Sequence, residues 1–553
     1  MVSEDSTDSA DTNRQHTDHG ATDNNNDHQH QDNGPKKSSR VVGGGGSASG
    51  TNQFPNDSER QPLLSPDDPG VSPLNVSNVK IAKLLLNTFS FLSTIWFILL
   101  LLSDFVSIPG LNNKGRSFLE INFVLVSLYS TLTTLAFFKI PSKLERLLGY
   151  ITAGVIGFVI ILLLLFQREQ MGKVGTLSAL WAFLTIIFTS ISEYLVEQGK
   201  IHEEIRLTGR VETRRTLTEW VVIFIRNVFK TVLLIYVSFI SLNVILHVFD
   251  TLRVKPWGEL VPVEEDSFRL HLSCFGDVST NESSSQPILL LESGHNSNEE
   301  FSEWVEELYH LNKIDRYCIY DRPGFGFSDS SPSPVSISIV SELLSEALRK
   351  QKINGPFLLV GFDIGGLYST VFASHNTAQI ESILLVDSWH EDLLLKDPNS
   401  KTKKREPLPK GVSSMGPGAG LKLWLRGFFS PLGLSAQASW LFKHHGSRDR
   451  IYGRDLHVQG QYLRARLQEQ ISASVLSYNE VISSKSSLVD IPISVVSSDY
   501  VIKKSLNWGN WQRQLTKISS NTKEWKIADG DHEIWKSPKG RSDLQDVLLR
   551  LLE

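Results

Sequence analysis

Long apolar blocks dominate the chain between residues 80 and 250. Five follow one another, over residues 84–107, 118–138, 149–166, 174–192 and 221–248. Each is near the ~20 residues that an α-helix needs to cross the hydrocarbon core of a bilayer. The pattern predicts a multi-pass membrane region over 81–250 with about five helices. The third block is short and the second carries several Ser and Thr residues, so a re-entrant pair is the alternative.

The pattern changes after about residue 260. Short apolar segments that resemble strands recur there, at Phe268–Phe275, Ile288–Leu291, Tyr317–Tyr320, Phe357–Val360, Ile383–Val386 and Ile491–Val496. A helical pattern over 335–350 separates the third from the fourth. Short apolar strands that alternate with helices are typical of a buried, mainly parallel sheet. Residues 260–553 are therefore expected to form an α/β domain.

The first 80 residues are polar and of low complexity, rich in Asn, Asp, Ser, Gly, His and Gln. They have too few apolar residues to offset the entropy of ordering, so a disordered tail is expected. Its histidines (His16, His19, His28 and His30) could bind a metal, but low complexity accounts for them better. No apolar segment follows Met1, which argues against a signal peptide.

One short element of the tail is more specific. Glu59 lies four residues before the pair Leu63 and Leu64, and this spacing resembles the acidic dileucine sorting signal. Cytosolic adaptor proteins read that signal and route cargo to endosomes, lysosomes or the vacuole. The resemblance implies a sorting adaptor as a partner and an endomembrane location, the vacuole or lysosome first. Such hexapeptides also arise by chance, and that alternative stays open.

Charge bears on partners and on orientation. The net charge of −5 gives no electrostatic support for nucleic-acid binding. Lys and Arg are concentrated in the loops after the second and fourth blocks, at Lys139, Lys143, Arg146, Lys200, Arg206, Arg210, Arg214 and Arg215. The positive-inside rule then places the N-terminus in the cytosol. Five spans would put the C-terminal domain on the lumenal or outer side, where the sequon at Asn281 can be glycosylated.

The blocks contain almost no ionisable residue, whereas carriers and pumps usually need some in mid-membrane. The helices are therefore interpreted as an anchor, with the lipid bilayer as partner, rather than as a transport path. A transporter with an accessory domain is the alternative. The chain has two cysteines, Cys274 and Cys318, without a CxxC motif or Cys/His cluster that would indicate a metal site.

Three motifs of the C-terminal region occur in an informative order. They are CIYDRPGFGFSD at 318–329, LLVGFDIGGL at 358–367 and ILLVDSWHEDL at 383–393. Together they resemble landmarks of the α/β-hydrolase superfamily, over roughly residues 265–553. The resemblance implies that fold, with an oxyanion loop at 291–296 and a helical cap at about 400–485. It also places Cys274 and Cys318 on neighbouring strands, where two buried thiols are expected rather than a disulfide.

The superfamily carries its nucleophile on a sharp turn with the pattern G-x-nucleophile-x-G. Here the segment reads Gly361-Phe362-Asp363-Ile364-Gly365, so the glycines that the turn requires are present and Asp363 replaces the usual serine. The pattern resembles epoxide hydrolases and haloalkane dehalogenases, in which an aspartate forms an ester that water hydrolyses. The alternative is a domain that has lost catalysis and keeps its fold for binding.

The resemblance also assigns the rest of the site. His532 stands where the family has its catalytic histidine. Asp499 is the first choice for the acid that orients this histidine, and Asp387 is the alternative. The backbone N–H groups of His295 and Ile364 are the candidate oxyanion donors.

Several positions depart from the family patterns. Ile364 replaces the tryptophan that follows the aspartate in dehalogenases, and Phe362 replaces the histidine before the nucleophile. Epoxide hydrolases protonate the opening ring with cap tyrosines, for which the candidates are Tyr452, Tyr462 and Tyr478. The cap also has an apolar surface around Leu421–Leu425 beside the basic segment Lys401–Arg405. This surface either dips into the bilayer to admit a lipophilic substrate or closes over the domain core.

We therefore expect an integral-membrane hydrolase of an apolar ester or epoxide, without cofactor or metal. In that function Asp363 is the nucleophile, His532 activates water and Asp499 orients the histidine. The competing hypothesis is a membrane scaffold or receptor whose inactive hydrolase domain binds a lipid or a protein.

Overall fold

The computed structural model describes residues 64–553 except for 66–67, 69, 107, 112–117, 212–214, 279–285, 396 and 398–414. Glu59, Leu63 and Asn281 lie outside the described residues, as do the tail histidines and Lys401–Arg405. Leu64 is described, and its backbone N–H donates to the carbonyl of Leu207 at 3.0 Å.

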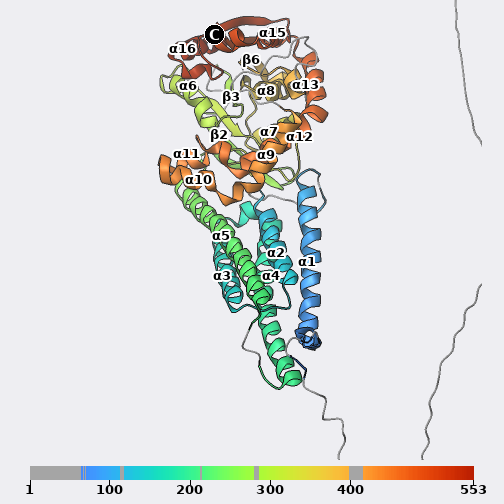
Figure 1. Cartoon of the computed structure of the whole chain (residues 1–553). Helices are drawn as coiled ribbons and strands as arrows, with labels where there is room; N and C mark the ends of the chain where they lie inside the picture. Colours follow the sequence, from blue (N-terminus) through green and yellow to red (C-terminus); the bar gives the residue numbers. More distant parts are fainter. Residues whose placement is uncertain are drawn as a thin grey trace, which may run out of the picture. The chain divides into compact units, whose positions relative to one another are not determined.

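Within the described residues, five helices are long and apolar enough to cross a membrane. They are α1 (Ser77–Ser103), α2 (Leu119–Ala136), α3 (Lys143–Phe166), α4 (Arg168–Thr208) and α5 (Leu217–Arg253). The expectation of about five spans is confirmed. Helix α4 packs against α1, α2 and α3 (Figure 1). It is bent near its start at Gly172, which has a φ of 65°.

Small residues bring these helices close together. A Cβ added at Gly149 of α3 would stand 2.2 Å from Ser190 Oγ of α4, and one at Gly199 of α4 would stand 2.6 Å from a methyl group of Val79 in α1. Hydroxyl groups also pair between helices, as in the 3.1 Å contact of Ser130 with Thr189. Close backbone approach and interhelical hydrogen bonds are how helices associate in a membrane.

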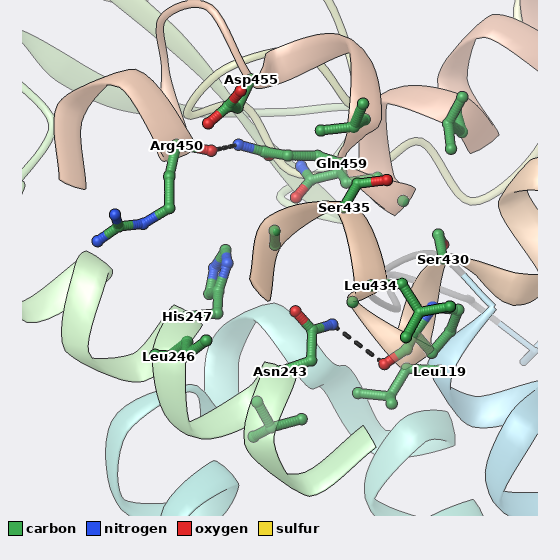
Figure 2. Close-up of a pocket in the computed structure, with 18 of the residues that line it drawn as sticks. Leu119, Asn243, Leu246, His247, Ser430, Leu434, Ser435, Arg450, Asp455 and Gln459 are labelled. Carbon is green, nitrogen blue, oxygen red and sulfur yellow. Dashed lines mark hydrogen bonds between the residues drawn. The ribbon is translucent and has the colours of Figure 1, made fainter. Parts of the chain in front are cut away.

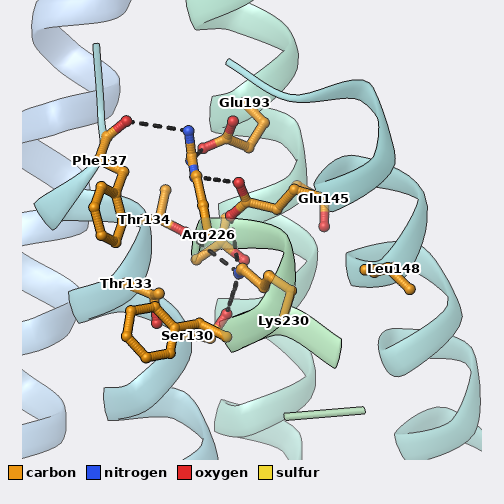
Figure 3. A network of polar contacts seen from close by, with 12 residues as sticks. Ser130, Thr133, Thr134, Phe137, Glu145, Leu148, Glu193, Arg226 and Lys230 are labelled. Carbon is orange, nitrogen blue, oxygen red and sulfur yellow. Dashed lines mark hydrogen bonds and ion pairs between the residues drawn. The ribbon is translucent and has the colours of Figure 1, made fainter. Parts of the chain in front are cut away.

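A cluster of four charged side chains lies between α3, α4 and α5 (Figure 3). Arg226 of α5 forms ion pairs with Glu145 of α3 and Glu193 of α4, while Lys230 lies 3.6 Å from Glu145. None of the four side chains is more than 4% exposed. Arg226 also donates to the carbonyl oxygen of Phe137 at 3.1 Å, in the turn that joins α2 to α3. Two carboxylates thus balance two cations.

The expectation that the spans hold almost no ionisable residue is therefore wrong. The hydropathy pattern missed the cluster because its four residues come from three separate parts of the chain. Glu145 and Glu193 flank apolar blocks, and only Arg226 and Lys230 fall inside one. Each residue alone looks like a boundary or isolated charge, and only helix packing brings the four together.

The C-terminal domain contains an eight-stranded sheet, counted over the described residues. Its strands are β1 (Glu259–Val263), β2 (Phe268–Phe275), β3 (Ile288–Glu292), β4 (Tyr317–Asp321), β5 (Phe357–Phe362), β6 (Ile380–Val386), β7 (Ile493–Ser498) and β8 (Thr522–Ala528). Their order is β1-β2-β4-β3-β5-β6-β7-β8, antiparallel from β1 to β4 and parallel from β4 to β8. The mainly parallel sheet is as expected.

Two apolar cores cover the two faces of this sheet. One contains side chains of α7 (Ile337–Lys350) and α8 (Gly365–His375), and the other contains side chains of α6 (Asn298–His310) and α16 (Pro538–Leu552). The apolar pattern of the sequence did not predict two of the strands, β1 and β8. β8 alternates between half-exposed and exposed positions, so it lacks the continuous apolar run of the central strands. β1 is short and pairs only with β2.

Cys274 and Cys318 form a disulfide, which corrects the expectation of two buried thiols. That expectation assumed parallel neighbours. In the structure β2 runs antiparallel to β4, and the two cysteines are direct partners in the register, with their Cα atoms 4.0 Å apart. Residues directly opposite each other on antiparallel strands come close enough to form a disulfide, whereas neighbours on parallel strands rarely do.

The cap is inserted between β6 and β7. Its helices are α9 (Pro417–Phe429), α10 (Leu434–Ala438), α11 (Ser447–Ile451), α12 (Gly460–Ser472) and α13 (Tyr478–Ser484), and α14 (Asp499–Lys504) and α15 (Leu506–Leu515) follow β7. Buried Arg464 of α12 binds buried Asp104, just after α1, at 2.9 Å. Arg450 of α11 binds Asp250 of α5 at 2.7 Å. The cap is thus bonded to two membrane helices.

We predict that Arg226→Met destabilises the full-length protein by about 3–5 kcal/mol, because it leaves two buried carboxylates facing each other with one cation. The measurement is the thermal unfolding midpoint of the detergent-purified protein. Arg253→Met is the matched control, since it removes an exposed arginine from the same helix. The double variant Arg226→Met with Glu193→Gln should recover part of the loss. Equal midpoints for Arg226→Met and Arg253→Met would contradict a stabilising role.

Candidate active site

Asp363 lies on a sharp turn between β5 and α8, in the left-handed region at a φ of 55°. Neighbouring backbone forces glycine on both sides of this turn. A Cβ at Gly365 would stand 2.3 Å from the carbonyl oxygen of Glu292, and one at Gly361 would stand 2.6 Å from the Cα of Gly366. The turn has the geometry that the Gly-x-Asp-x-Gly pattern predicts, and it holds the Asp363 side chain at the end of the central strand.

His532 connects Asp363 to a second carboxylate. Its Nε2 lies 3.1 Å from Asp363 Oδ1, and its Nδ1 lies 2.7 Å from Asp387 Oδ2. All three residues are buried, at 1%, 4% and 0% exposure for Asp363, His532 and Asp387. The sequence places these residues at 363, 387 and 532, and the sheet brings them into one hydrogen-bonded row.

Asp387 takes the position beside the histidine that was expected for Asp499. Asp387 follows β6, the direct neighbour of β5, and its Oδ1 accepts hydrogen bonds from the Ser498 backbone at 3.1 Å and from Trp508 Nε1 at 2.9 Å. Asp499 begins α14, one strand further away, and binds Lys503 at 2.6 Å and the Gly530 backbone at 3.2 Å. The preference for Asp499 was wrong. The order of the strands within the sheet decides which carboxylate reaches His532, and the order of the motifs along the chain does not show it.

His295 holds the second oxygen of the Asp363 carboxylate. Its backbone N–H donates to Asp363 Oδ2 at 3.3 Å, and its ring Nδ1 lies 3.1 Å from the same atom. The approach depends on Gly294, where a Cβ would stand 2.4 Å from Asp363 Cβ. Ile364 follows Asp363 as the N-cap residue of α8, and its side chain belongs to the core. A role of its N–H as oxyanion donor stays a prediction.

The charges around Asp363 keep it ionised. Burial alone would raise its pKa, but His295 and His532 outweigh burial and hold the pKa of this carboxyl far below its usual range. Burial likewise lowers the pKa of His532, but the hydrogen bonds and charges of Asp363 and Asp387 raise it to about 10. The site at rest is therefore an imidazolium between two carboxylates.

A second layer of buried charges covers Asp363 from the cap. Glu469 of α12 accepts from His295 Nε2 at 3.1 Å, from Arg466 at 2.7 Å and from Tyr368 at 2.9 Å. Burial would raise the pKa of Glu469, but His295 and Arg466 lower it. No sequence motif marks Glu469, because it lies in a cap helix outside the motifs of the hydrolase fold.

Arg322 binds the oxyanion loop through the loop's backbone carbonyl oxygens. It pairs with Glu292 at 2.8 Å and donates to the carbonyl oxygens of Ser293 at 2.6 Å and Gly294 at 2.7 Å. Burial raises the pKa of Glu292 to about 7, although Arg322 opposes the shift. The place of Arg322 in the DRPGFG segment, one of the motifs of the hydrolase fold, is the signal by which the sequence could have indicated this residue.

The structure separates the three candidate tyrosines of the cap. Tyr462 of α12 is buried and donates to the carbonyl oxygen of His295 at 2.9 Å. Tyr452 stacks on Phe327, with ring centroids 4.8 Å apart, and Tyr478 packs against the sheet core. Tyr462 thus contacts His295, a residue that binds Asp363. No group of three or more potential metal ligands occurs among the residues described.

Two family models match the chain. Residues 43–274 match a family described as a region of unknown function (DUF2417), and residues 286–407 match the alpha/beta hydrolase fold. The second match confirms the fold of the C-terminal domain. It covers the elbow and the Asp387 strand but ends before the cap and His532.

Relatives resemble the chain over most of its length. An uncharacterized vacuolar membrane protein of Saccharomyces cerevisiae is 35% identical, over 85% of this chain and 87% of its own. An uncharacterized protein of Schizosaccharomyces pombe is 26% identical, over 81% of this chain and 86% of its own. The similarity therefore extends across both the membrane region and the hydrolase domain.

Two solved structures match about half of the chain. An alpha/beta hydrolase enzyme from a deep-sea metagenome library is 15% identical, with a TM-score of 0.37, and covers 53% of this chain and 95% of its own. An esterase from Exiguobacterium antarcticum is 14% identical, with a TM-score of 0.37, and covers 53% of this chain and 99% of its own.

The raised pKa of His532 predicts a pH dependence of stability. A group whose pKa is higher in the folded state binds more protons there, so its stabilisation is complete below the unfolded pKa and is lost as pH rises through the folded one. The unfolding midpoint of the full-length protein should fall as pH rises from about 6.5 to about 10.

His532→Gln should flatten this fall, and His310→Gln, which removes an exposed histidine, should not. Tryptophan fluorescence during chemical unfolding at a series of pH values measures it. A slope unchanged in His532→Gln would mean that another group carries the proton.

Proposed function

The chain belongs to the family of the yeast vacuolar membrane protein described above, and on this premise we propose that it is an integral-membrane hydrolase with Asp363 as nucleophile. The substrate class is an apolar epoxide. An apolar ester is the second substrate class. Attack of Asp363 on its acyl carbon would release the alcohol and form a mixed anhydride, which water would then hydrolyse.

One observation carries the proposal, namely the different partners of the two Asp363 oxygens. Oδ2 accepts from the backbone N–H of His295, and Oδ1 faces Nε2 of His532. In a serine enzyme the oxyanion donors bind the carbonyl oxygen of the substrate. When the nucleophile is an aspartate, the carbonyl that water attacks is its own, so the donors belong on its second oxygen. The contact of His295 with Oδ2 fits that chemistry.

In the first step Asp363 Oδ1 attacks a ring carbon of the epoxide. A carbon–oxygen bond forms to Asp363, the ring carbon–oxygen bond breaks, and the released oxygen takes a proton. Tyr462 is the candidate donor on the cap side. Ester formation removes the negative charge of Asp363, so the pKa of His532 falls and its proton passes to the tyrosinate. His532 is then neutral.

In the second step His532 Nε2 takes a proton from water, and the hydroxide attacks the Asp363 Cγ. The oxyanion forms at Oδ2, where the His295 N–H stabilises it. The intermediate collapses with cleavage of the bond between Cγ and Oδ1, so Oδ1 leaves with the product as an alkoxide, which is protonated by the new carboxylic acid. Asp363 returns to its ionised form, His532 is again an imidazolium held by Asp387, and the product is a diol.

A binding domain without turnover is the second candidate, and one observation favours it. Asp363 is 1% exposed, and His295, whose N–H binds it, is itself contacted by Tyr462 and Glu469 of α12. A substrate would reach the buried carboxylate only if residues around it moved. A domain that uses its hydrolase fold to bind a lipid or a protein has no need of that movement.

We further propose that the protein lies in the vacuolar membrane with its N-terminus in the cytosol and the hydrolase domain in the lumen. The vacuolar membrane relative and the five apolar helices support the location. The Cys274–Cys318 disulfide supports the orientation, because disulfides persist in oxidising compartments and are rare in the cytosol.

The first test is to trap the ester. His532→Gln removes the base that activates water, so incubation with a panel of apolar epoxides should leave an adduct of substrate mass on the peptide that carries Asp363. Turnover should fall by about 10²–10⁴-fold, the range for loss of a general base. With wild-type enzyme in excess in ¹⁸O-labelled water, one turnover should place the label in Asp363 and not in the diol. Peptide mass spectrometry measures both results.

Two variants provide controls for this test. Asp363→Asn combined with His532→Gln should abolish the adduct, and Asp387→Asn should slow turnover whereas Asp499→Asn should not. No adduct and no turnover across epoxides and esters would reject the hydrolase and leave the binding domain. Label found in the diol alone would indicate direct attack of water instead of a covalent step.

The orientation has its own test. In sealed vacuolar vesicles with the cytosolic face outward, added protease should remove the N-terminal tail and leave the hydrolase domain intact. Glycosidase should shift the mobility of the wild type but not of Asn281→Gln, and a maleimide should label the cysteines only after reduction. Digestion of the domain in intact vesicles would reverse the proposed orientation.

A further inference from the structure

Two cavities lie where the C-terminal part of α5 meets the cap, and Figure 2 shows the first of them. The first, of about 250 Å³, lies between Asn243 and His247 of α5 and the cap segments around Ser430, Leu434 and Gln459. The second, of about 480 Å³, is lined by the ends of α3 and α5 and by the loop at 326–329. His247, Gln459 and Gln461 line both, so the two form one groove.

The groove has an excess of positive charge. Two carboxylates of its lining have a guanidinium partner, since Asp250 binds Arg450 at 2.7 Å and Asp329 binds Arg269 at 2.8 Å, and a third, Asp455, lies 2.9 Å from the His445 ring. Two further guanidinium groups, Arg426 in the first cavity and Arg168 in the second, are exposed. Neither is paired with a carboxylate among the described residues. The groove is therefore complementary to an anion.

Apolar side chains continue from the groove onto the outer surface. Leu434 and Phe429 line the first cavity and are 55% and 52% exposed, and Leu252 lines the second and is 52% exposed. Further along the cap, Leu441 and Phe442 are exposed as well. On α5 this surface is continuous with Phe249 and other outward-facing residues of a helix long enough to span the bilayer. Cationic groups beside exposed apolar surface are typical of contact with the membrane interface.

We propose that this groove binds an anionic phospholipid from the leaflet next to the hydrolase domain. The phosphate lies against Arg426 and His247, with Asn243 and Gln459 as further hydrogen-bonding partners. The acyl chains leave along Phe429, Leu434 and the outer face of α5. The site lies outside the Asp363 centre and does not depend on the proposed reaction.

Helix α12 lies between this groove and the Asp363 site. Gln461 and Leu463 of α12 line the groove, while Tyr462 and Glu469 contact His295, which binds Asp363. A lipid in the groove therefore packs against the same helix that contacts the site. The proposal concerns the lipid site itself, so that loss of hydrolase activity and loss of lipid binding are separate results.

The test uses full-length protein in a neutral detergent, titrated with phosphatidic acid or with phosphatidylcholine and observed by native mass spectrometry. Wild type should retain phosphatidic acid about tenfold more tightly than phosphatidylcholine, as expected for a charge-assisted contact. Arg426→Gln combined with Arg168→Gln should abolish that preference. A photoactivatable phosphatidic acid should crosslink to peptides of α5 and the cap.

Arg349→Gln combined with Arg513→Gln is the matched control, because both arginines are exposed and lie outside the groove. It should keep the preference, and all variants should share the wild-type unfolding midpoint. Equal retention of both lipids by wild type, or a preference that survives in Arg426→Gln with Arg168→Gln, would overturn the proposal. Equally tight binding of glycerol 3-phosphate would mean a site for soluble phosphate, and would overturn it too.

Discussion

The ion pair of Arg464 with Asp104 joins the two halves of this protein. Both side chains are buried, at 1% and 2% exposure, and the atoms that meet are 2.9 Å apart. An unpaired charge at such a place is strongly destabilising, so α12 and the end of α1 must stay together. The same helix carries Tyr462, two residues before Arg464, and Glu469, five residues after it, and both contact His295 beside Asp363. The helix that is bonded to the end of α1 therefore also contacts the site.

Buried charge also organises the membrane region. Glu145, Glu193, Arg226 and Lys230 form a balanced set, and Arg226 reaches the turn between α2 and α3 as well. In an apolar surrounding such groups are retained only when they are paired. The cluster fixes the relative positions of α3, α4 and α5. The helices are thus more than an apolar anchor, because charged groups as well as apolar side chains join them.

The exchange of serine for aspartate at the elbow changes what the surrounding groups can do. With serine, the His295 N–H would face the substrate. With Asp363 it binds the carboxylate of the turn itself, and His532 becomes an imidazolium between two carboxylates. The glycines, the backbone donor and the histidine thus surround a carboxylate where a serine enzyme has a hydroxyl group.

The sequence alone determined the features that depend on neighbouring residues. Block length and hydropathy predicted five spans, continuous apolar runs predicted the central strands, and the spacing of Gly361 and Gly365 predicted the turn that carries Asp363. The position of His532 followed from its place near the end of the domain. Each of these is a local property, set by backbone geometry and by burial of one segment.

Only the tertiary structure decided the features that join distant residues. Asp387, not Asp499, meets His532 because β6 lies beside β5 and β7 does not. Cys274 meets Cys318 because β2 is antiparallel to β4. The pairs of Arg226 with Glu193 and of Glu469 with His295 follow from helix packing. The pattern of a single segment carries no information on which segment packs against it, and these contacts depend on that arrangement.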